Sequence, residues 1–182
     1  PLIIEAGDEE ARAALSVPHL QVEAAADMVA VQWGKLLLNL NNALNALSGL
    51  PLKQQLLDRR WRRVLAASQE EALSLMDAAG IRPWSVGPLP ARLLPRLLRL
   101  PTPLFRLAAS SAVRIDPLAR SSMWEDLQRG RPTEIDDLQG AVIRLAERLG
   151  RRALMAERVR DAVRSREAAP DAAAVAPEQL LG

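Results

Sequence analysis

The 182-residue sequence contains no cysteine and a single histidine, His19. The lack of cysteine excludes disulfide bonds, cysteine-ligated zinc, iron–sulfur clusters and a thiol nucleophile, and one histidine cannot form a multi-histidine metal site. No apolar run approaches the roughly 18 residues that a membrane span needs, and the first residues lack the basic segment and apolar stretch of a secretion signal. These absences lead us to expect a cytoplasmic protein without a metal ion.

Aromatic residues make up only 3% of the chain, whereas leucine and alanine contribute 32 and 31 residues. This composition is typical of helical proteins, because β-sheet proteins use more aromatic and β-branched residues. The basic residues are also uneven, with 22 arginines against two lysines, Lys35 and Lys53. In a chain that uses arginine almost everywhere, each lysine is a candidate for a specific role.

Residues 1–25 differ in pattern from the rest of the chain. The apolar run Leu2-Ile3-Ile4 predicts a strand, Asp8 can cap a short helix through Ala14, and residues 19–24 contain a second possible strand. Two strands alone are unstable unless a third strand or a helix packs on them. We therefore interpret this β-α-β segment as the remnant of a larger domain, or as strands that pair with another chain.

From residue 26 onward the pattern is helical, and the predicted fold class is mainly α. Apolar periodicity and cap residues predict helices over residues 27–47, 59–79, 91–100, 103–111, 121–130, 133–149 and 153–166. At the start of the sixth helix, Thr133 and Asp136 have the spacing of a capping box. Residues 26–166 thus form one helical domain, and residues 167–182, rich in alanine and proline, are expected to be disordered.

The helix predicted over residues 27–47 carries an unusual polar stripe. At 100° per residue, Lys35, Asn39 and Asn42 lie within about 60° of one another, opposite a face of leucines. Asparagine is a poor residue within a helix, because its side chain competes for backbone hydrogen bonds. The stripe is either a solvated face or a ligand site. A ligand site suits the chemistry, since amides both donate and accept hydrogen bonds and lysine, unlike arginine, can release a proton.

Two motifs together resemble the ketopantoate reductase (2-dehydropantoate 2-reductase) family. The first, Trp33-Gly34-Lys35-Leu36-Leu37-Leu38-Asn39 followed by Ala43-Leu44-Asn45-Ala46-Leu47, is similar to the first helix of that family's C-terminal domain. The second, Ser121-Ser122-Met123-x-x-Asp126 with Gly130-Arg131-x-Thr133-Glu134-Ile135-Asp136, is similar to its second signature. The motifs occur in the family's order, about 85 residues apart, and the resemblance covers residues 3–150.

This resemblance implies a helical C-terminal domain of the ketopantoate reductase and 6-phosphogluconate dehydrogenase-like type, preceded by a Rossmann domain that binds NADPH. It implies an oxidoreductase that reduces a 2-keto acid to a 2-hydroxy acid in pantothenate and coenzyme A biosynthesis. The partners implied are a 2-keto acid and a second copy of the chain, with no nucleic acid and no membrane. By resemblance, Lys35 is the general acid that protonates the carbonyl oxygen. Asn39, Ser122 and Glu134 bind the substrate, and Glu134 is also a candidate cofactor ligand.

The chain also departs from the family pattern. An asparagine that the family has eight residues after the lysine is Ala43 here, and the adjacent Asn42, on the Lys35 face, is a candidate to replace it. An asparagine often found three residues before the serine is Ala119, which leaves the identity of the 2-keto acid open. The Gly-x-Gly-x-x-Gly loop that binds a dinucleotide is absent. We therefore expect NADP to be bound mainly by a domain outside this sequence, of which residues 1–25 are the end, and the isolated chain to be inactive.

Two other functions are compatible with the sequence. A helical domain of this kind can serve dimerisation without catalysis. A basic module for nucleic acid or an anionic membrane is suggested by six arginines between Ala78 and Ile115, a stretch without an acidic residue. Against the basic module, the formal net charge of the whole chain is only +2 and no helix-turn-helix or RNA-binding motif is present.

Overall fold

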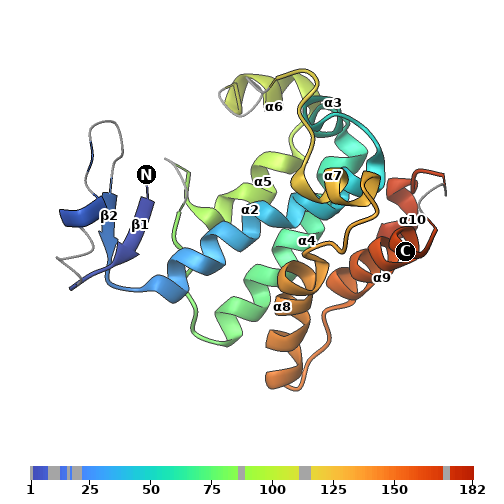
Figure 1. Ribbon diagram of the computed structural model, residues 1–182. Coiled ribbons are helices and arrows are strands. Elements are labelled where there is room, and N and C mark those ends of the chain that lie inside the picture. The colour runs from blue at the N-terminus through green and yellow to red at the C-terminus, as the bar shows by residue number, and fades with distance from the viewer. Residues whose placement is uncertain are drawn as a thin grey trace.

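Helices make up most of the protein, as predicted. The computed structural model describes residues 2–7, 13–15, 17, 22–85, 89–110, 116–169 and 173–182. Its elements are β1 (Leu2–Glu5), β2 (Val22–Ala25), α2 (Met28–Ser48), α3 (Leu52–Leu57), α4 (Arg59–Ala78), the 3-10 helix η1 (Ala91–Leu93), α5 (Leu94–Arg99), α6 (Thr102–Ala108), α7 (Ser122–Gln128), α8 (Ile135–Arg148), α9 (Leu154–Ala168) and α10 (Pro177–Leu181). Figure 1 shows the helices gathered into one body, with the two strands at its edge.

The two strands form a parallel pair in which Leu2 lies opposite Val22 and Glu5 opposite Ala25. A parallel pair requires a crossover connection, and residues 13–15 within that connection are helical. The predicted β-α-β order is therefore present in the described residues, whereas the predicted cap Asp8 and the single histidine lie outside them. In Figure 1 the pair lies apart from the helical body, where α2 begins.

Helix α2 is the central element of the helical body. Asp27 caps its start by accepting a hydrogen bond from Ala30 N at 2.9 Å, and Gly49 ends it at a φ of 65°, which glycine adopts without strain. Its apolar face packs against α4, α7, α8 and α9. The bounds of α2 agree with the predicted helix over residues 27–47 to within one residue, because Asp27 and Gly49 mark its two ends.

Arg62 of α4 is buried, with only 1% of its surface exposed. All five N–H groups of its guanidinium have acceptors, which are Leu98 O (3.0 Å), Leu56 O (2.9 Å), Leu57 O (3.1 Å), Leu100 O (2.9 Å) and Thr102 Oγ1 (3.1 Å). The ring centroid of Phe105 is 4.4 Å from its Cζ atom. Arg62 thus joins α4 to α3, α5 and α6.

The acceptors explain why the fold tolerates a buried cation at this position. The four carbonyls lie at or just beyond the C-terminal ends of α3 and α5, where carbonyls lack partners within the helix and the helix dipole is negative. Burial lowers the pKa of Arg62 from its ordinary value, and the nearby Arg59 acts in the same direction. The guanidinium nevertheless stays charged near neutral pH, since an arginine does not lose its proton there.

The predicted capping box at the start of α8 is wrong. Helix α8 has Glu134 at its N-cap, and no side chain caps it. Thr133 instead donates its backbone N–H and its hydroxyl to Glu167 Oε1 on α9, at 2.9 and 2.8 Å. The side chain of Asp136 pairs with Arg164 of α9 and does not cap α8. The Glu167 carboxylate thus holds Thr133, the residue before the N-cap, against α9, and the first turn of α8 has no side-chain cap.

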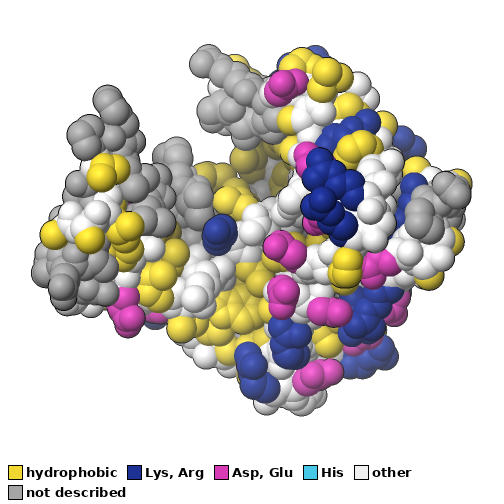
Figure 2. Space-filling view, viewed as in Figure 1, with side chains coloured by type: hydrophobic (Ala, Val, Ile, Leu, Met, Phe, Trp, Pro, Cys, Tyr) yellow, Lys and Arg dark blue, Asp and Glu magenta, His cyan; other side chains and the backbone are white. Residues whose placement is uncertain are grey.

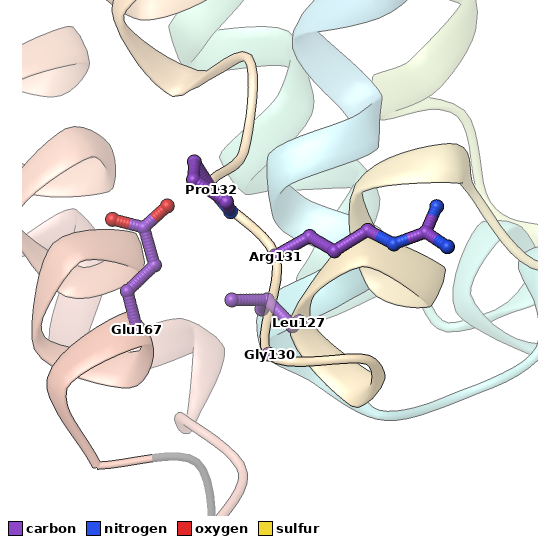
Figure 3. Close-up of a pocket in the computed structure, with 5 residues that line it drawn as sticks. All are labelled: Leu127, Gly130, Arg131, Pro132 and Glu167. Carbon is purple, nitrogen blue, oxygen red and sulfur yellow. The ribbon is translucent and has the colours of Figure 1, made fainter.

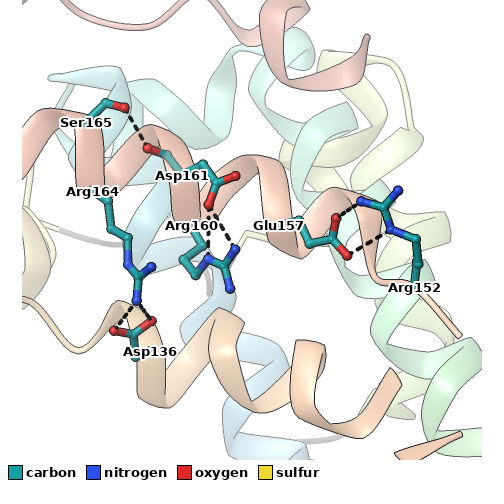
Figure 4. Close-up of polar contacts among 7 residues, drawn as sticks. All are labelled: Asp136, Arg152, Glu157, Arg160, Asp161, Arg164 and Ser165. Carbon is teal, nitrogen blue, oxygen red and sulfur yellow. Dashed lines mark hydrogen bonds and ion pairs between the residues drawn. The ribbon is translucent and has the colours of Figure 1, made fainter. Parts of the chain in front are cut away.

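Ion pairs hold α9 against α8 and stiffen its start (Figure 4). Arg164 of α9 donates to both carboxylate oxygens of Asp136, at 2.8 and 2.9 Å, and this contact raises the pKa of Arg164. Arg152 pairs with Glu157 at the first turn of α9. Because the arginine of each pair is exposed to solvent, water screens the attraction and each pair contributes little to stability.

The C-terminal residues differ from the expected disordered tail. Helix α9 continues to Ala168, and residues 173–182 include α10, which packs against α4 and α9. Val175 N donates to Leu47 O at 3.2 Å, and Leu180 belongs to the core with 3% of its surface exposed. The alanine and proline content predicted disorder, but the bundle offers an apolar surface on which the few large residues of this segment are buried.

The turn of α2 that precedes Lys35 is crossed by the segment after α4. Trp84 N donates to Ala30 O at 2.8 Å, which holds residues 81–85 on the helix. Gly34 is buried beneath this segment, and a Cβ atom at position 34 would lie 2.1 Å from Trp84 O. Glycine at this position therefore allows the two backbones to touch.

We expect Arg62→Ala to lower the free energy of unfolding by about 3–5 kcal/mol, because it leaves buried carbonyls unpaired and opens a cavity. Arg62→Lys keeps the charge but offers fewer donors, so its loss is expected to be about 2 kcal/mol. Urea denaturation followed by circular dichroism measures both. The matched control is Arg63→Ala, an exposed neighbour, with a change within about 0.5 kcal/mol. Equal effects at the two positions would contradict this role of Arg62.

We expect Gly34→Ala and Gly140→Ala to have opposite effects, although both glycines are buried in helices. Gly34→Ala forces a methyl group into Trp84 O and should destabilise the chain by about 1–3 kcal/mol. At Gly140 the nearest atom is the movable Arg144 guanidinium, 3.0 Å away. Gly140→Ala should therefore stabilise the chain by up to about 1 kcal/mol through helix propensity. Thermal denaturation compares the two, and a stabilised Gly34→Ala variant would disprove the close contact.

Candidate functional site

The polar stripe predicted on α2 begins at an open part of the helix and continues into the bundle. Lys35 is exposed, whereas Asn39 and Asn42 are half-buried. Within the described part of the chain, the side chains of these three residues form no hydrogen bond or ion pair. Lys35 and Asn42 are two helical turns apart, which is roughly 10 Å along the axis. The stripe therefore presents one amine and two amides that the fold itself does not use.

The other two asparagines of α2 are used by the fold. Asn41 exchanges two side-chain hydrogen bonds with Gln55 of α3, at 3.3 and 2.8 Å. Asn45 is fully buried; its side chain donates to Leu50 O at 2.9 Å and accepts from Ser121 N at 2.9 Å. The structure thus separates two asparagines that hold neighbouring segments from Asn39 and Asn42, which do not.

The start of α7 is fastened to the inner end of the stripe. Ser121 caps α7, and its hydroxyl donates to Asn42 O at 3.0 Å. Ser122 follows directly, is exposed, and its side chain has no partner among the residues that the structure describes. Figure 1 shows α7 beside the end of α2. The structure therefore brings two of the predicted site residues, Asn42 and Ser122, onto adjoining turns.

Glu134 lies at the start of a helix that also packs on α2. Gln139 of α8 donates to Leu40 O in the middle of α2, at 3.4 Å, and Glu134 stands at the N-cap of that helix. Its carboxylate is exposed and forms no hydrogen bond or ion pair with the described residues. Helix packing thus brings the elements that carry Glu134 and Ser122 to the helix that carries Lys35.

Sequence reasoning missed Arg120, which lies two residues before Ser122. Its Cζ atom is 4.1 Å from the ring centroid of Trp124, and it donates to Gly49 O at 2.7 Å. Arg120 therefore fixes a positive charge beside the start of α7.

Two cavities lie near these elements. One of about 270 Å³, at the turn between α7 and α8, is lined by Leu127, Gly130, Arg131, Pro132 and Glu167. Figure 3 shows Glu167 reaching toward this turn from α9, while the Arg131 side chain points away. The other, of about 200 Å³, is mainly apolar and lies between α2, α3, α4, α5 and α6. Neither cavity has any of the five predicted site residues among its described lining residues.

The arginine-rich stretch is partly neutralised by α4. Arg92 pairs with Asp77 and Arg99 with Glu70, each at 2.5 Å. Figure 2 shows basic and acidic side chains interspersed over the helical body in this view. These pairs reduce the positive charge that a nucleic-acid site would need.

The described residues lack the groupings that a metal site or a membrane span requires. They contain no group of three or more His, Cys, Asp or Glu side chains placed to hold a metal ion, and no helix among them is both long and apolar enough to cross a membrane. The phosphates of a dinucleotide need a glycine-rich turn after a strand. The parallel pair of β1 and β2 suits such a domain, but no two glycines of the sequence are spaced as Gly-x-Gly. The glycine spacing of such a turn is thus absent from this sequence.

Comparison with solved structures shows the same fold in two ketopantoate reductases. A PanE/ApbA family ketopantoate reductase from Ralstonia eutropha JMP134 is 26% identical, with a TM-score of 0.70 over 91% of this chain and 51% of that one. A dimeric ketopantoate reductase from Staphylococcus aureus, with evidence of kinetic cooperativity, is 15% identical, with a TM-score of 0.65 over 91% of this chain and 53% of that one. The chain thus spans about half the length of each. No curated protein matches it by sequence.

The family model described as "Ketopantoate reductase PanE/ApbA C terminal" matches residues 27–167. This range begins at the cap of α2, ends within α9 and includes all five predicted site residues. The resemblance that the two motifs indicated is therefore confirmed over most of the chain. The chain belongs to the ketopantoate reductase family, of which it carries the helical C-terminal domain.

Proposed function

We propose that this chain supplies the substrate-binding face and the proton donor of an NADPH-dependent 2-keto acid reductase of the ketopantoate type. The reaction converts a 2-keto acid to a 2-hydroxy acid, the step that yields pantoate in pantothenate and coenzyme A biosynthesis. The observation that carries this proposal is the stripe of Lys35, Asn39 and Asn42. Its side chains are unpartnered among the described residues, and its inner end adjoins Ser122.

Lys35 has the chemistry for the proton transfer. Its ammonium donates a proton to the keto oxygen while the carbonyl carbon is reduced, which prevents a full negative charge on that oxygen. Arginine does not do this, because it keeps its proton near neutral pH. Lys35 is exposed in this chain, and a second domain closed over α2 would exclude water from the reacting atoms.

The remaining side chains bind and orient the substrate. The amides of Asn39 and Asn42 donate to and accept from the oxygens of a keto acid, and Asn42 takes the place of the family asparagine replaced by Ala43. Ala43 itself is fully buried and cannot reach a ligand. Ser122 binds the polar end of the substrate. Glu134 accepts hydrogen bonds from hydroxyl groups of the substrate or the cofactor.

The nicotinamide cofactor supplies the hydride when it is bound, and another part of the protein holds its phosphates. We place the end of that NADP-binding domain at residues 1–25, the substrate domain at residues 26–166, and the whole enzyme in the cytoplasm as a homodimer. The parallel order of β1 and β2 supports the first assignment, since parallel strands are typical of dinucleotide-binding domains. The isolated chain is accordingly expected to show no reductase activity.

We expect Lys35→Ala and Lys35→Arg in the full-length protein to lower kcat for ketopantoate reduction by about 100- to 10,000-fold, the range for loss of a general acid. Lys35→Arg keeps the charge but not the releasable proton, so it should not rescue activity. NADPH oxidation measures turnover, and fluorescence titration measures the Kd for NADPH, which should change no more than a few-fold.

Lys53→Arg is the matched control, because Lys53 is the second of only two lysines and lies in α3, outside the stripe. It should leave turnover unchanged. Turnover of Lys35→Arg within a few-fold of the unaltered enzyme would disprove the general-acid role. A full-length protein that dimerises but does not turn over NADPH with any 2-keto acid would favour the alternative of a non-catalytic dimerisation domain.

A further inference from the structure

The apolar cavity of about 200 Å³ beside α2 has no role in the site described so far. Its walls are leucines from α2, α3, α4 and α5, closed by Phe105 of α6 and by Ala109. In Figure 2 hydrophobic side chains line the recess beside α6. An apolar protein cavity of about 150 Å³ is large enough to bind benzene. This pocket can therefore hold a branched aliphatic or aromatic group.

The mouth of the pocket adjoins the polar stripe. Leu38 lines the pocket and is 37% exposed. It follows Lys35 by three residues and precedes Asn42 by four, and residues with these spacings are neighbours on a helix, with Cβ atoms about 5–6 Å apart. A keto acid bound along the stripe thus has the pocket directly beside it.

The polar groups in the wall do not favour a charged occupant. Asn41 is already paired through both of its amide atoms with Gln55. Gln69 donates to Leu37 O at 3.0 Å, while its Oε1 is buried without a partner in the described part of the chain. A charged or strongly hydrated group would lose its water here and gain at most one acceptor. The chemistry of the wall therefore selects an apolar group.

We propose that this pocket is the subsite for the side chain of the 2-keto acid, and that the preferred substrates carry a branched aliphatic or aromatic side chain. The inference rests on the proposed function, since it places the keto and carboxylate groups at the stripe. It adds a specificity determinant formed by α2, α5 and α6, with Leu38 at the boundary between head and tail of the substrate.

The test uses the 182-residue chain and three probes that separate head from tail. Pyruvate carries the head alone, 4-methylpentan-1-ol the tail alone, and 4-methyl-2-oxopentanoate both. NMR follows the methyl groups of Leu38 and Leu97 and the side-chain amides of Asn39 and Asn42. We expect the alcohol to shift the methyl groups, pyruvate to shift the amides, and the third probe to shift both. The third probe should bind on the order of tenfold tighter than pyruvate, because it also buries its side chain.

Three variants connect the gain in affinity to the pocket. Ala109→Leu fills the pocket, and Leu38→Asn, at a partly exposed position with little risk to folding, makes its mouth polar. Both variants should bind 4-methyl-2-oxopentanoate no more tightly than pyruvate. Leu107→Asn is the matched control, since Leu107 is 78% exposed on α6 and does not line the pocket. It should preserve the gain in affinity.

The outcomes distinguish this inference from the proposed function. Equal affinity for pyruvate and 4-methyl-2-oxopentanoate, with unmoved pocket methyl groups, overturns the subsite and leaves the proposed function standing. Binding of the alcohol in the pocket without any response of the Asn39 and Asn42 amides to either keto acid overturns both. It would show an apolar site that is unconnected to the stripe.

Discussion

Four leucines on one face of α2, at positions 37, 40, 44 and 47, are at most 2% exposed. Burying each stabilises the fold by roughly 1.5–3 kcal/mol, so the helix cannot rotate about its axis without a large loss. The helices α4, α7, α8 and α9 all contact α2. The orientation of Lys35 toward the open side is therefore a consequence of core packing.

The sequence predicted those elements whose limits are set locally. Asp27 and Asp58 each cap a helix with a side-chain hydrogen bond to the first turn, and both helices were predicted to within one residue. Helix α3 was missed, because its six residues depend on Arg62, which binds its last carbonyls from the next helix. The predictions for the start of α8 and for the C-terminal segment were wrong for the same reason, because the residues that contact these segments lie in distant helices.

For the site, too, the sequence predicted features that depend on nearby residues and missed those that depend on distant ones. Helical periodicity placed Lys35, Asn39 and Asn42 on one face, and the structure agrees. Periodicity could not separate Asn39 and Asn42 from the other asparagines, because the partners of Asn41 and Asn45 lie 14 and 76 residues away. The apolar pocket was invisible in the sequence, since residues of five different helical segments form it. The asparagines without a hydrogen-bond partner could be distinguished only once the partners of the others were known.

In the proposed function the side chains of Asn39 and Asn42 serve a ligand and not the fold. The free energy of unfolding of four single Asn→Ala variants of α2 tests it most directly. We expect a loss of about 1–3 kcal/mol for Asn45→Ala, a smaller loss for Asn41→Ala, and changes within about 0.5 kcal/mol for Asn39→Ala and Asn42→Ala. A loss at Asn39 or Asn42 as large as that at Asn45 would contradict it, because the stripe would then be part of the fold's own hydrogen bonding.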